Sequence, residues 1–155
     1  RGVASPMLDA VARAPLWARL AEYGHGTGHG VGYYLNVHEG PQVISYRAVP
    51  GPHTAMQPGM ITSNEPGLYR PGRWGIRIEN LVCNVSAGTS EFGEFLEFET
   101  LTLCPIDTRC VQRGQLRQDE VDWINAYHAE VRRRLAPKVS GAALAWLMHR
   151  TEALP

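Results

Sequence analysis

The sequence HGTGHGVGYYLNVHEGP at residues 25–41 constrains this chain more strongly than any other stretch, because it sets three histidines among five glycines. Glycine occupies every second position from 26 to 32. Such a run cannot form a regular helix, since glycine destabilises a helix interior. Glycine also lets one backbone segment pass close to another. The pattern therefore predicts a loop or a short strand that presents imidazole groups to a site.

The histidines have a functional and a structural explanation. His25 and His29 are four residues apart, which on a helix would resemble the HExxH zinc motif, but no glutamate follows His25. A metal ligand and a substrate-facing imidazole on a loop fit better. The structural alternative is that these rings only form hydrogen bonds within a glycine-rich turn. Because His38 adds a third imidazole to the same window, the functional interpretation is favoured.

Two carboxylates follow in motifs of their own, Glu65 in SNEPG and Glu79 in GIRIEN. A buried carboxylate must pair, take a proton or bind a metal, because an unpaired buried charge is costly. An ion pair with Arg77 or Arg73 would be a purely structural explanation for either glutamate. Together with His29, the two glutamates favour an oxygen-rich metal site, which suits manganese and similar hard cations.

Hydrophobic periodicity predicts the elements around these motifs. Helices are expected at residues 6–22, interrupted at Pro15, at 118–135, and at 141–151 with Ser140 as a cap. Strands are expected at residues 33–37, 60–65, 75–85 and 95–103, with a connecting loop at 41–57 and a turn or loop at 66–74. A strict period of two along 75–85 would place Arg77 and Glu79 on one face of the strand.

Composition narrows the class of protein. The chain of 155 residues can support one domain, and a net charge of zero gives no reason to expect nucleic acid or an anionic membrane as a partner. No apolar run approaches the roughly 20 residues of a membrane span. The start at Arg1, without a methionine, suggests a fragment or a processed chain. Three cysteines without a CxxC pair favour reduced thiols and a cytoplasmic location: Cys83, Cys104 and Cys110.

The order HGTGHGVG, LNVHEGP, GMITSNEPGLY and GIRIEN closely resembles the signature of aminopeptidase P, the Xaa-Pro aminopeptidase family with the pita-bread fold. FLEFETLTLCPI and the DWINAYH helix resemble the C-terminal extension of its long, cytoplasmic branch, with Thr100 where proline is expected. The resemblance implies an α+β fold. Residues 1–104 would be the C-terminal half of the pita-bread (creatinase/aminopeptidase) catalytic domain, and residues 105–155 a helical C-terminal extension.

The resemblance also implies a site with two divalent metal ions, most simply Mn²⁺, with Zn²⁺ or Co²⁺ as substitutes. His29 would be a ligand to one metal. Glu65 would bind metal and relay a proton, and Glu79 would bridge the two ions. The reaction would be two-metal hydrolysis of the bond before a proline in second position, which releases the N-terminal residue of a peptide.

The remaining site residues would handle the substrate. His38 would be catalytic together with Glu65, since it would hydrogen-bond the substrate near the scissile carbonyl and stabilise the tetrahedral intermediate. His25 would line the pocket for the proline ring. Arg77 would not bind metal itself but would orient the carboxylates that do.

One part of the family site has no counterpart, because that family also needs two aspartates from a hairpin upstream of the histidines. The candidates have the wrong context: Asp9, Asp107, Asp119 and Asp122. We therefore expect this chain to be the C-terminal part of a longer enzyme, and to bind metal weakly and be inactive by itself. The missing N-terminal part of the parent would be its partner.

Two other functions remain open. One is a prolidase-like dipeptidase, which would cleave dipeptides rather than longer peptides. The other is a non-catalytic pita-bread domain that serves interaction only. The C-terminal helices could simply cover the core, or they could form a homodimer interface as in the long aminopeptidase P branch, with contacts from Trp123, Trp146 and Met148.

Overall fold

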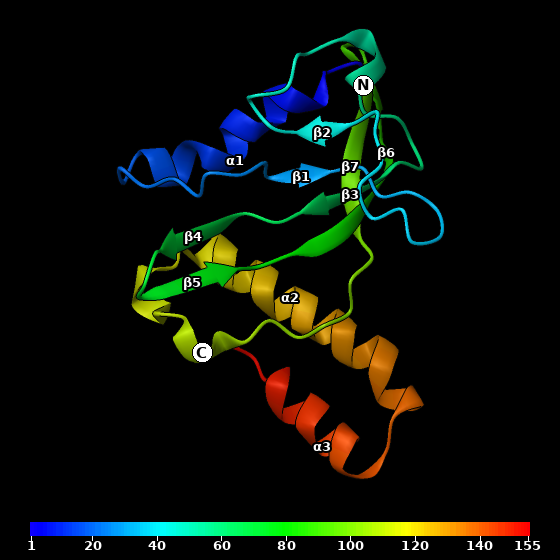
Figure 1. The fold of residues 1–155 in the computed structure, drawn as a ribbon. Helices are drawn as coiled ribbons and strands as arrows, with labels where there is room; N and C mark the ends of the chain where they lie inside the picture. The colour runs from blue at the N-terminus through cyan, green and yellow to red at the C-terminus, as the bar shows by residue number, and fades with distance from the viewer. The chain divides into compact units, whose positions relative to one another are not determined.

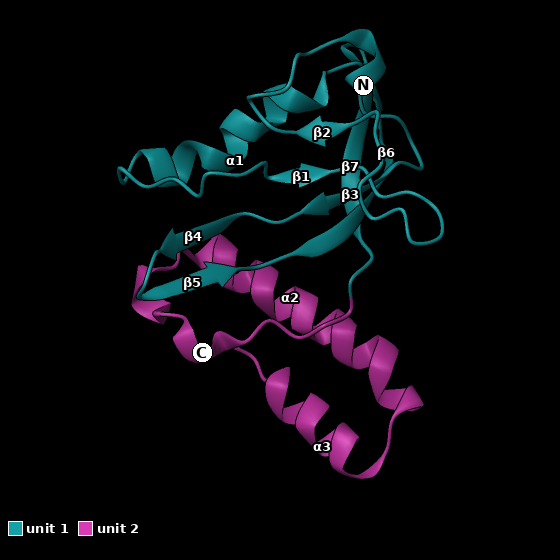
Figure 2. Cartoon of the chain, in the orientation of Figure 1, with its two compact units in different colours: residues 1–102 teal, residues 103–155 magenta.

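The computed structural model describes all of residues 1–155 (Figure 1). The chain divides into two compact units, residues 1–102 and residues 103–155, which Figure 2 colours separately. The first unit contains helix α1 and all the strands, and the second contains helices α2 and α3. Each unit is described by itself. The boundary between catalytic domain and C-terminal extension, placed between residues 104 and 105 from the sequence, stays a prediction.

Helix α1 of the first unit, Leu8–Trp17, follows a 3-10 turn at Ser5–Met7 and is shorter than the predicted helix. Pro15 lies inside the helix and does not interrupt it. The chain turns at Leu20, which has a φ of 55°. Two of the apolar residues whose spacing predicts this helix, Val11 and Leu20, are exposed. The buried residues of α1 are instead the polar Asp9 and Arg13, one helical turn apart.

The main sheet of the first unit is antiparallel, with strand order β3-β6-β7. Its strands are β3 at Ile61–Asn64, β6 at Asn80–Ser90 and β7 at Gly93–Thr100. A short pair, β1 at Gly28–His29 and β2 at Val43–Ile44, lies against this sheet through a bridge from Gly30 to Thr62. The glycine-rich segment therefore does form a short strand, as the sequence predicts.

A separate hairpin is formed by β4 at Gly67–Arg70 and β5 at Trp74–Arg77. The predicted turn or loop over residues 66–74 is confirmed at its centre and wrong at its flanks, which pair as strands. The turn at Pro71–Arg73 contains Gly72 with a φ of 72°, and the Arg73 N–H donates to the Arg70 carbonyl at 2.9 Å. The proline and glycine therefore mark the turn of a hairpin, while its flanks pair as strands.

Two other strand predictions are wrong. Residues 33–37 form an exposed loop in which Tyr34 and Leu35 have positive φ, because the Gly32 N–H bonds to the Asn36 carbonyl and closes a tight turn. The predicted strand 75–85 is interrupted between β5 and β6. Glu79 lies in that two-residue link, so the alternation that would place it on one face with Arg77 does not apply.

The second unit is helical and agrees closely with the predicted elements. Helix α2 spans Gln118–Leu135 and α3 spans Gly141–Arg150, with 3-10 turns at Thr108–Cys110, Arg113–Gln115 and Ala136–Lys138. Its core is Tyr127, Val131 and Leu147, packed against Leu103, Ile106, Leu135 and Val139. Ser140 is at the N-cap position of α3 but makes no capping bond with its side chain. None of the chain's helices combines the length and apolarity needed to cross a bilayer.

The buried imidazole of His128 should make the second unit sensitive to acid. Its Nε2 accepts a hydrogen bond from the Ile106 N–H at 3.1 Å, which requires an unprotonated Nε2. Burial lowers the pKa of His128 from its ordinary value of 6.5. As the pH falls below 6.5, the unfolded chain takes up the proton first, so the stability from the neutral ring is progressively lost.

We predict that the amides of α2 lose protection from hydrogen exchange between about pH 7 and about pH 5, after correction for the intrinsic exchange rate. His128→Gln is the control, because its side-chain carbonyl can accept the Ile106 bond without titrating. The variant should show a weaker dependence on pH. The same dependence in both proteins would contradict the role of His128.

Candidate metal and substrate site

The approach of β1 to β3 sets the geometry of the candidate site. A Cβ at Gly28 would lie 1.9 Å from the Ser63 carbonyl oxygen, so only glycine allows the two backbones to come this close. The His29 N–H donates to the Ser63 hydroxyl oxygen at 3.0 Å, and the Glu65 N–H donates to the Thr27 carbonyl at 2.7 Å. These bonds lock the two segments so that His29 and Glu65 are neighbours.

The imidazole of His29 and the carboxylate of Glu65 converge on one point, with Nε2 and Oε1 3.2 Å apart. His29 Nδ1 lies 2.9 Å from the Gly30 carbonyl oxygen, which can only accept, so Nδ1 carries a hydrogen and Nε2 is the nitrogen that faces Glu65. Two electron-rich atoms at this distance are stable only with a cation, either a proton or a metal ion, between them. The Ser63 hydroxyl donates to the same Oε1 at 2.9 Å and fixes its direction.

His38 lies beside His29 and belongs to the loop that follows β1. Its ring centroid lies 4.2 Å from that of His29. The loop returns because the Glu39 N–H donates to the Gly30 carbonyl at 2.9 Å. The His38 side chain is exposed, so it can reach a bound molecule.

A second cluster joins His25, Tyr69 and Arg77. His25 Nδ1 lies 2.7 Å from the Gly26 carbonyl oxygen, so its Nε2 is the acceptor for the Tyr69 hydroxyl at 2.9 Å. Tyr69 in turn accepts a bond from Arg77 Nε at 2.7 Å. This bond, with the charges of Glu65 and Glu79, raises the pKa of Arg77.

Arg77 connects the two clusters, since its Nη1 lies 3.3 Å from Glu65 Oε2. Sequence reasoning placed Arg77 behind the carboxylates but missed Tyr69. Tyr69 could have been found only by predicting the hairpin. Pairing of β4 with β5 places Tyr69 opposite Gly75, and its hydroxyl accepts a bond from Arg77.

Glu79 does not join His29 and Glu65. Its side chain is exposed in the link between β5 and β6, and its charge helps to raise the pKa of Arg77. The chain holds no group of three or more histidine, cysteine, aspartate or glutamate side chains arranged to hold a metal ion. The structure therefore assembles two of the three expected ligands, an imidazole nitrogen and a carboxylate oxygen.

Comparison with known proteins gives matches along nearly the whole chain. Residues 1–84 match the family described as metallopeptidase family M24, and residues 94–154 match the C-terminal region of that peptidase family. Aminopeptidase P2 of Arabidopsis thaliana is 49% identical over 152 residues, which cover 96% of this chain and 21% of the relative. Xaa-Pro aminopeptidase 1 of Dictyostelium discoideum is 46% identical over 134 residues, 85% of this chain and 21% of the relative.

Among solved structures, the X-prolyl aminopeptidase of Caenorhabditis elegans, described as a cytosolic enzyme with a di-nuclear active site, matches with a TM-score of 0.88. It is 36% identical, and the match covers 99% of this chain and 25% of that one. The chain thus spans about a fifth to a quarter of the length of its relatives. These matches confirm the resemblance and the α+β, C-terminal pita-bread fold that the sequence predicts.

The close contact at Gly28 gives a direct test of the site's framework. Gly28→Ala should lower the free energy of unfolding of the first unit by more than about 2 kcal/mol, because the new methyl group meets backbone and β1 must separate from β3. Gly40→Ala is the control, since a Cβ there meets nothing within 4 Å. Denaturant unfolding would measure both, and equal stabilities would show that the close approach is not needed.

Proposed function

We propose that this chain, which belongs to metallopeptidase family M24, provides the C-terminal part of the catalytic domain of a metal-dependent Xaa-Pro aminopeptidase. The enzyme would release the N-terminal residue from peptides with proline in second position. The observation that carries the proposal is the convergence of His29 Nε2 and Glu65 Oε1 at 3.2 Å. The names of its relatives, aminopeptidase P2 and Xaa-Pro aminopeptidase 1, support the choice of substrate.

His29 and Glu65 fit a divalent metal by the chemistry of their donor atoms, and Glu79 is the third proposed ligand. Two divalent ions, most simply manganese with zinc or cobalt as alternatives, are proposed by analogy with the di-nuclear relative. Bound there, they would polarise the scissile carbonyl and lower the pKa of a bound water. The remaining ligands, two aspartates, would come from outside residues 1–155.

The protein's own groups would position the substrate and move a proton. Glu65 is held at Oε1 by Ser63 and approached at Oε2 by Arg77, so its carboxylate points in a fixed direction and can pass a proton to the leaving amine. His38, exposed beside His29, would donate a hydrogen bond to the substrate carbonyl. The rings of His25 and Tyr69, whose centroids are 5.5 Å apart, would offer an apolar surface to the proline ring.

The two alternatives make different predictions about substrate and metal. A prolidase-like enzyme would cleave only dipeptides, and a non-catalytic domain would bind no metal even in the longer protein. The names of the relatives, and the match over 99% of this chain to an X-prolyl aminopeptidase, support the aminopeptidase. We also propose a cytoplasmic location, by analogy with the cytosolic relative, and a homodimer through the second unit, where Trp123 and Trp146 are half exposed.

Metal binding by the chain alone can be measured first. We expect a manganese titration by calorimetry to show weak binding, because the structure assembles only two ligands. His29→Ala should abolish it, and His53→Ala, at an exposed histidine outside the site, should leave it unchanged. Two tight sites would contradict the proposal that further ligands lie outside this chain.

Activity is best tested in a longer protein that contains these residues. With manganese, it should cleave an Xaa-Pro-Xaa tripeptide, and this chain alone should not. Glu65→Gln should reduce kcat by at least about a hundredfold, because the amide can neither bind metal as a carboxylate nor carry the proton. Cleavage restricted to Xaa-Pro dipeptides would instead favour the prolidase-like function.

A further inference from the structure

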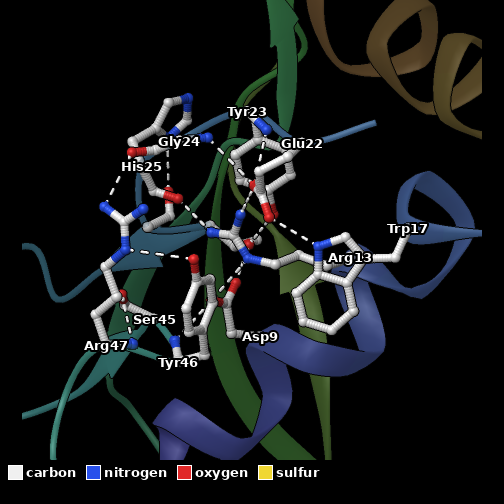
Figure 3. A network of polar contacts seen from close by, with 12 residues as sticks. Asp9, Arg13, Trp17, Glu22, Tyr23, Gly24, His25, Ser45, Tyr46 and Arg47 are labelled. Carbon is white, nitrogen blue, oxygen red and sulfur yellow. Dashed lines mark hydrogen bonds and ion pairs between the residues drawn. The ribbon is translucent and has the colours of Figure 1, made fainter. Parts of the chain in front are cut away.

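The buried face of helix α1 consists of an ion pair, which the proposed chemistry does not use. Asp9 and Arg13 are buried to 0% and 1% exposure, and Arg13 Nε donates to Asp9 Oδ2 at 2.8 Å. Figure 3 shows both side chains directed at the segment that leads into the glycine-rich stretch, including Glu22, Tyr23, Gly24 and His25. The pair therefore contacts the segment that carries His25, through the His25 carbonyl and the Thr27 hydroxyl.

Arg13 uses all three of its nitrogens on different partners. Nε binds Asp9, Nη1 binds the Glu22 carboxylate, and Nη2 binds the main-chain carbonyl of His25. Its guanidinium also packs on two aromatic rings, 4.0 Å from the Tyr23 centroid and 4.9 Å from the Tyr46 centroid. Because the guanidinium is planar and its donors have fixed directions, the carbonyl of His25 has one allowed position.

Asp9 holds the next part of the segment. Its Oδ1 accepts from the Thr27 hydroxyl, and its Oδ2 also accepts from the Tyr46 N–H at 2.7 Å. The carbonyl of the same Thr27 accepts the Glu65 N–H at 2.7 Å. The Asp9 carboxylate is therefore connected through one residue to the backbone of the proposed metal ligand Glu65.

Glu22 completes the network ahead of His25. It accepts from Trp17 Nε1 at 2.7 Å, from its neighbour Tyr23 N–H at 2.7 Å and from Gly24 N–H at 3.2 Å. Burial opposes its charge, but these bonds and Arg13 lower the pKa of Glu22 to about 2. Gly24 has a φ of 75°, so the chain turns sharply where these bonds hold it.

We propose that Asp9 and Arg13 are positioning residues for the substrate site, which fix the backbone at His25 and Thr27. The Arg13 bond to the His25 carbonyl would hold the His25 ring against Tyr69. The Asp9 bond to Thr27 would hold Glu65 against His29. The inference rests on the proposed function, since it concerns the same site. It goes further by assigning specificity for the substrate to a pair of residues that touches neither substrate nor metal.

Stability alone does not explain why this ion pair is buried. A buried ion pair loses its hydration, and well-packed apolar residues of similar volume are often as stable or more so. Apolar contacts have no preferred direction, whereas the pair directs hydrogen bonds at a hydroxyl and a carbonyl of one short segment. The pair thus supplies direction rather than net stability.

Arg13→Lys separates the two roles, because lysine keeps the charge and the bond to Asp9 but cannot reach three acceptors at once. In the wild-type chain, nitrogen NMR of the imidazoles should show the Nδ1–H tautomer at His25. In Arg13→Lys we expect loss of that single tautomer. Arg47→Lys is the matched control, because Arg47 also donates to the segment, at the Gly24 carbonyl, but is exposed. The control should keep the wild-type spectrum.

Thr27→Val tests the bond between Asp9 and Thr27 separately. It also tests the proposed positioning role if Arg13→Lys does not fold. It removes the hydroxyl that Asp9 holds and keeps the backbone. We expect the Glu65 amide to exchange at least about tenfold faster, with the His25 tautomer retained. An unchanged His25 spectrum in folded Arg13→Lys, or an unchanged Glu65 amide in Thr27→Val, would overturn the proposal.

These NMR readouts need neither metal nor substrate, so they can fail independently of the proposed function. In the longer enzyme, Arg13→Lys should raise KM for an Xaa-Pro tripeptide roughly tenfold with a smaller change in kcat, because His25 faces the proline. A protein without peptidase activity but with the expected spectra would overturn only the proposed function. A large loss of kcat with unchanged KM would overturn the assignment of the pair to substrate positioning.

Discussion

The close approach of two backbones at Gly28 and Ser63 is the constraint on which the candidate site depends. A Cβ on Gly28 would lie 1.9 Å from the Ser63 carbonyl oxygen, so any other residue would push the strands apart. Their separation decides whether His29 Nε2 and Glu65 Oε1, which come from residues far apart in the chain, lie 3.2 Å apart. Ser63 contributes twice, because its hydroxyl accepts from the His29 backbone and donates to the Glu65 carboxylate.

Local sequence pattern predicts what depends on near neighbours. Helices α2 and α3 lie within one residue of their predicted ends, since their apolar periodicity is a local property of the sequence. The hairpin β4–β5 and the loop at residues 33–37 were missed, because pairing depends on whether a partner strand is available and not on propensity. Tyr69 was missed for the same reason, as its place in the site follows from the hairpin.

Five of the residues proposed for the site were predicted from the sequence, but the way they assemble was not. His25, His29, His38, Glu65 and Arg77 stood out because glycine, proline and charge surround them in unusual patterns. The structure brings these five into two adjoining clusters through Arg77, while Glu79 stays exposed at the break between β5 and β6. A period-two pattern cannot reveal such a break, because Ile76, Ile78 and Asn80 alternate with charged residues straight through it.

Helix α1 shows most clearly why the remainder could not be predicted. Its leucines and valine favour an apolar face, yet Asp9 and Arg13 are the residues it buries. The sequence alone gives no sign that a carboxylate and a guanidinium four residues apart are buried rather than exposed to solvent, where such pairs are common. An apolar helix face could slide against the glycine-rich segment with little loss, because apolar contacts are not directional. A site built on two atoms 3.2 Å apart tolerates no such sliding, and directed hydrogen bonds to Thr27 and the His25 carbonyl prevent it.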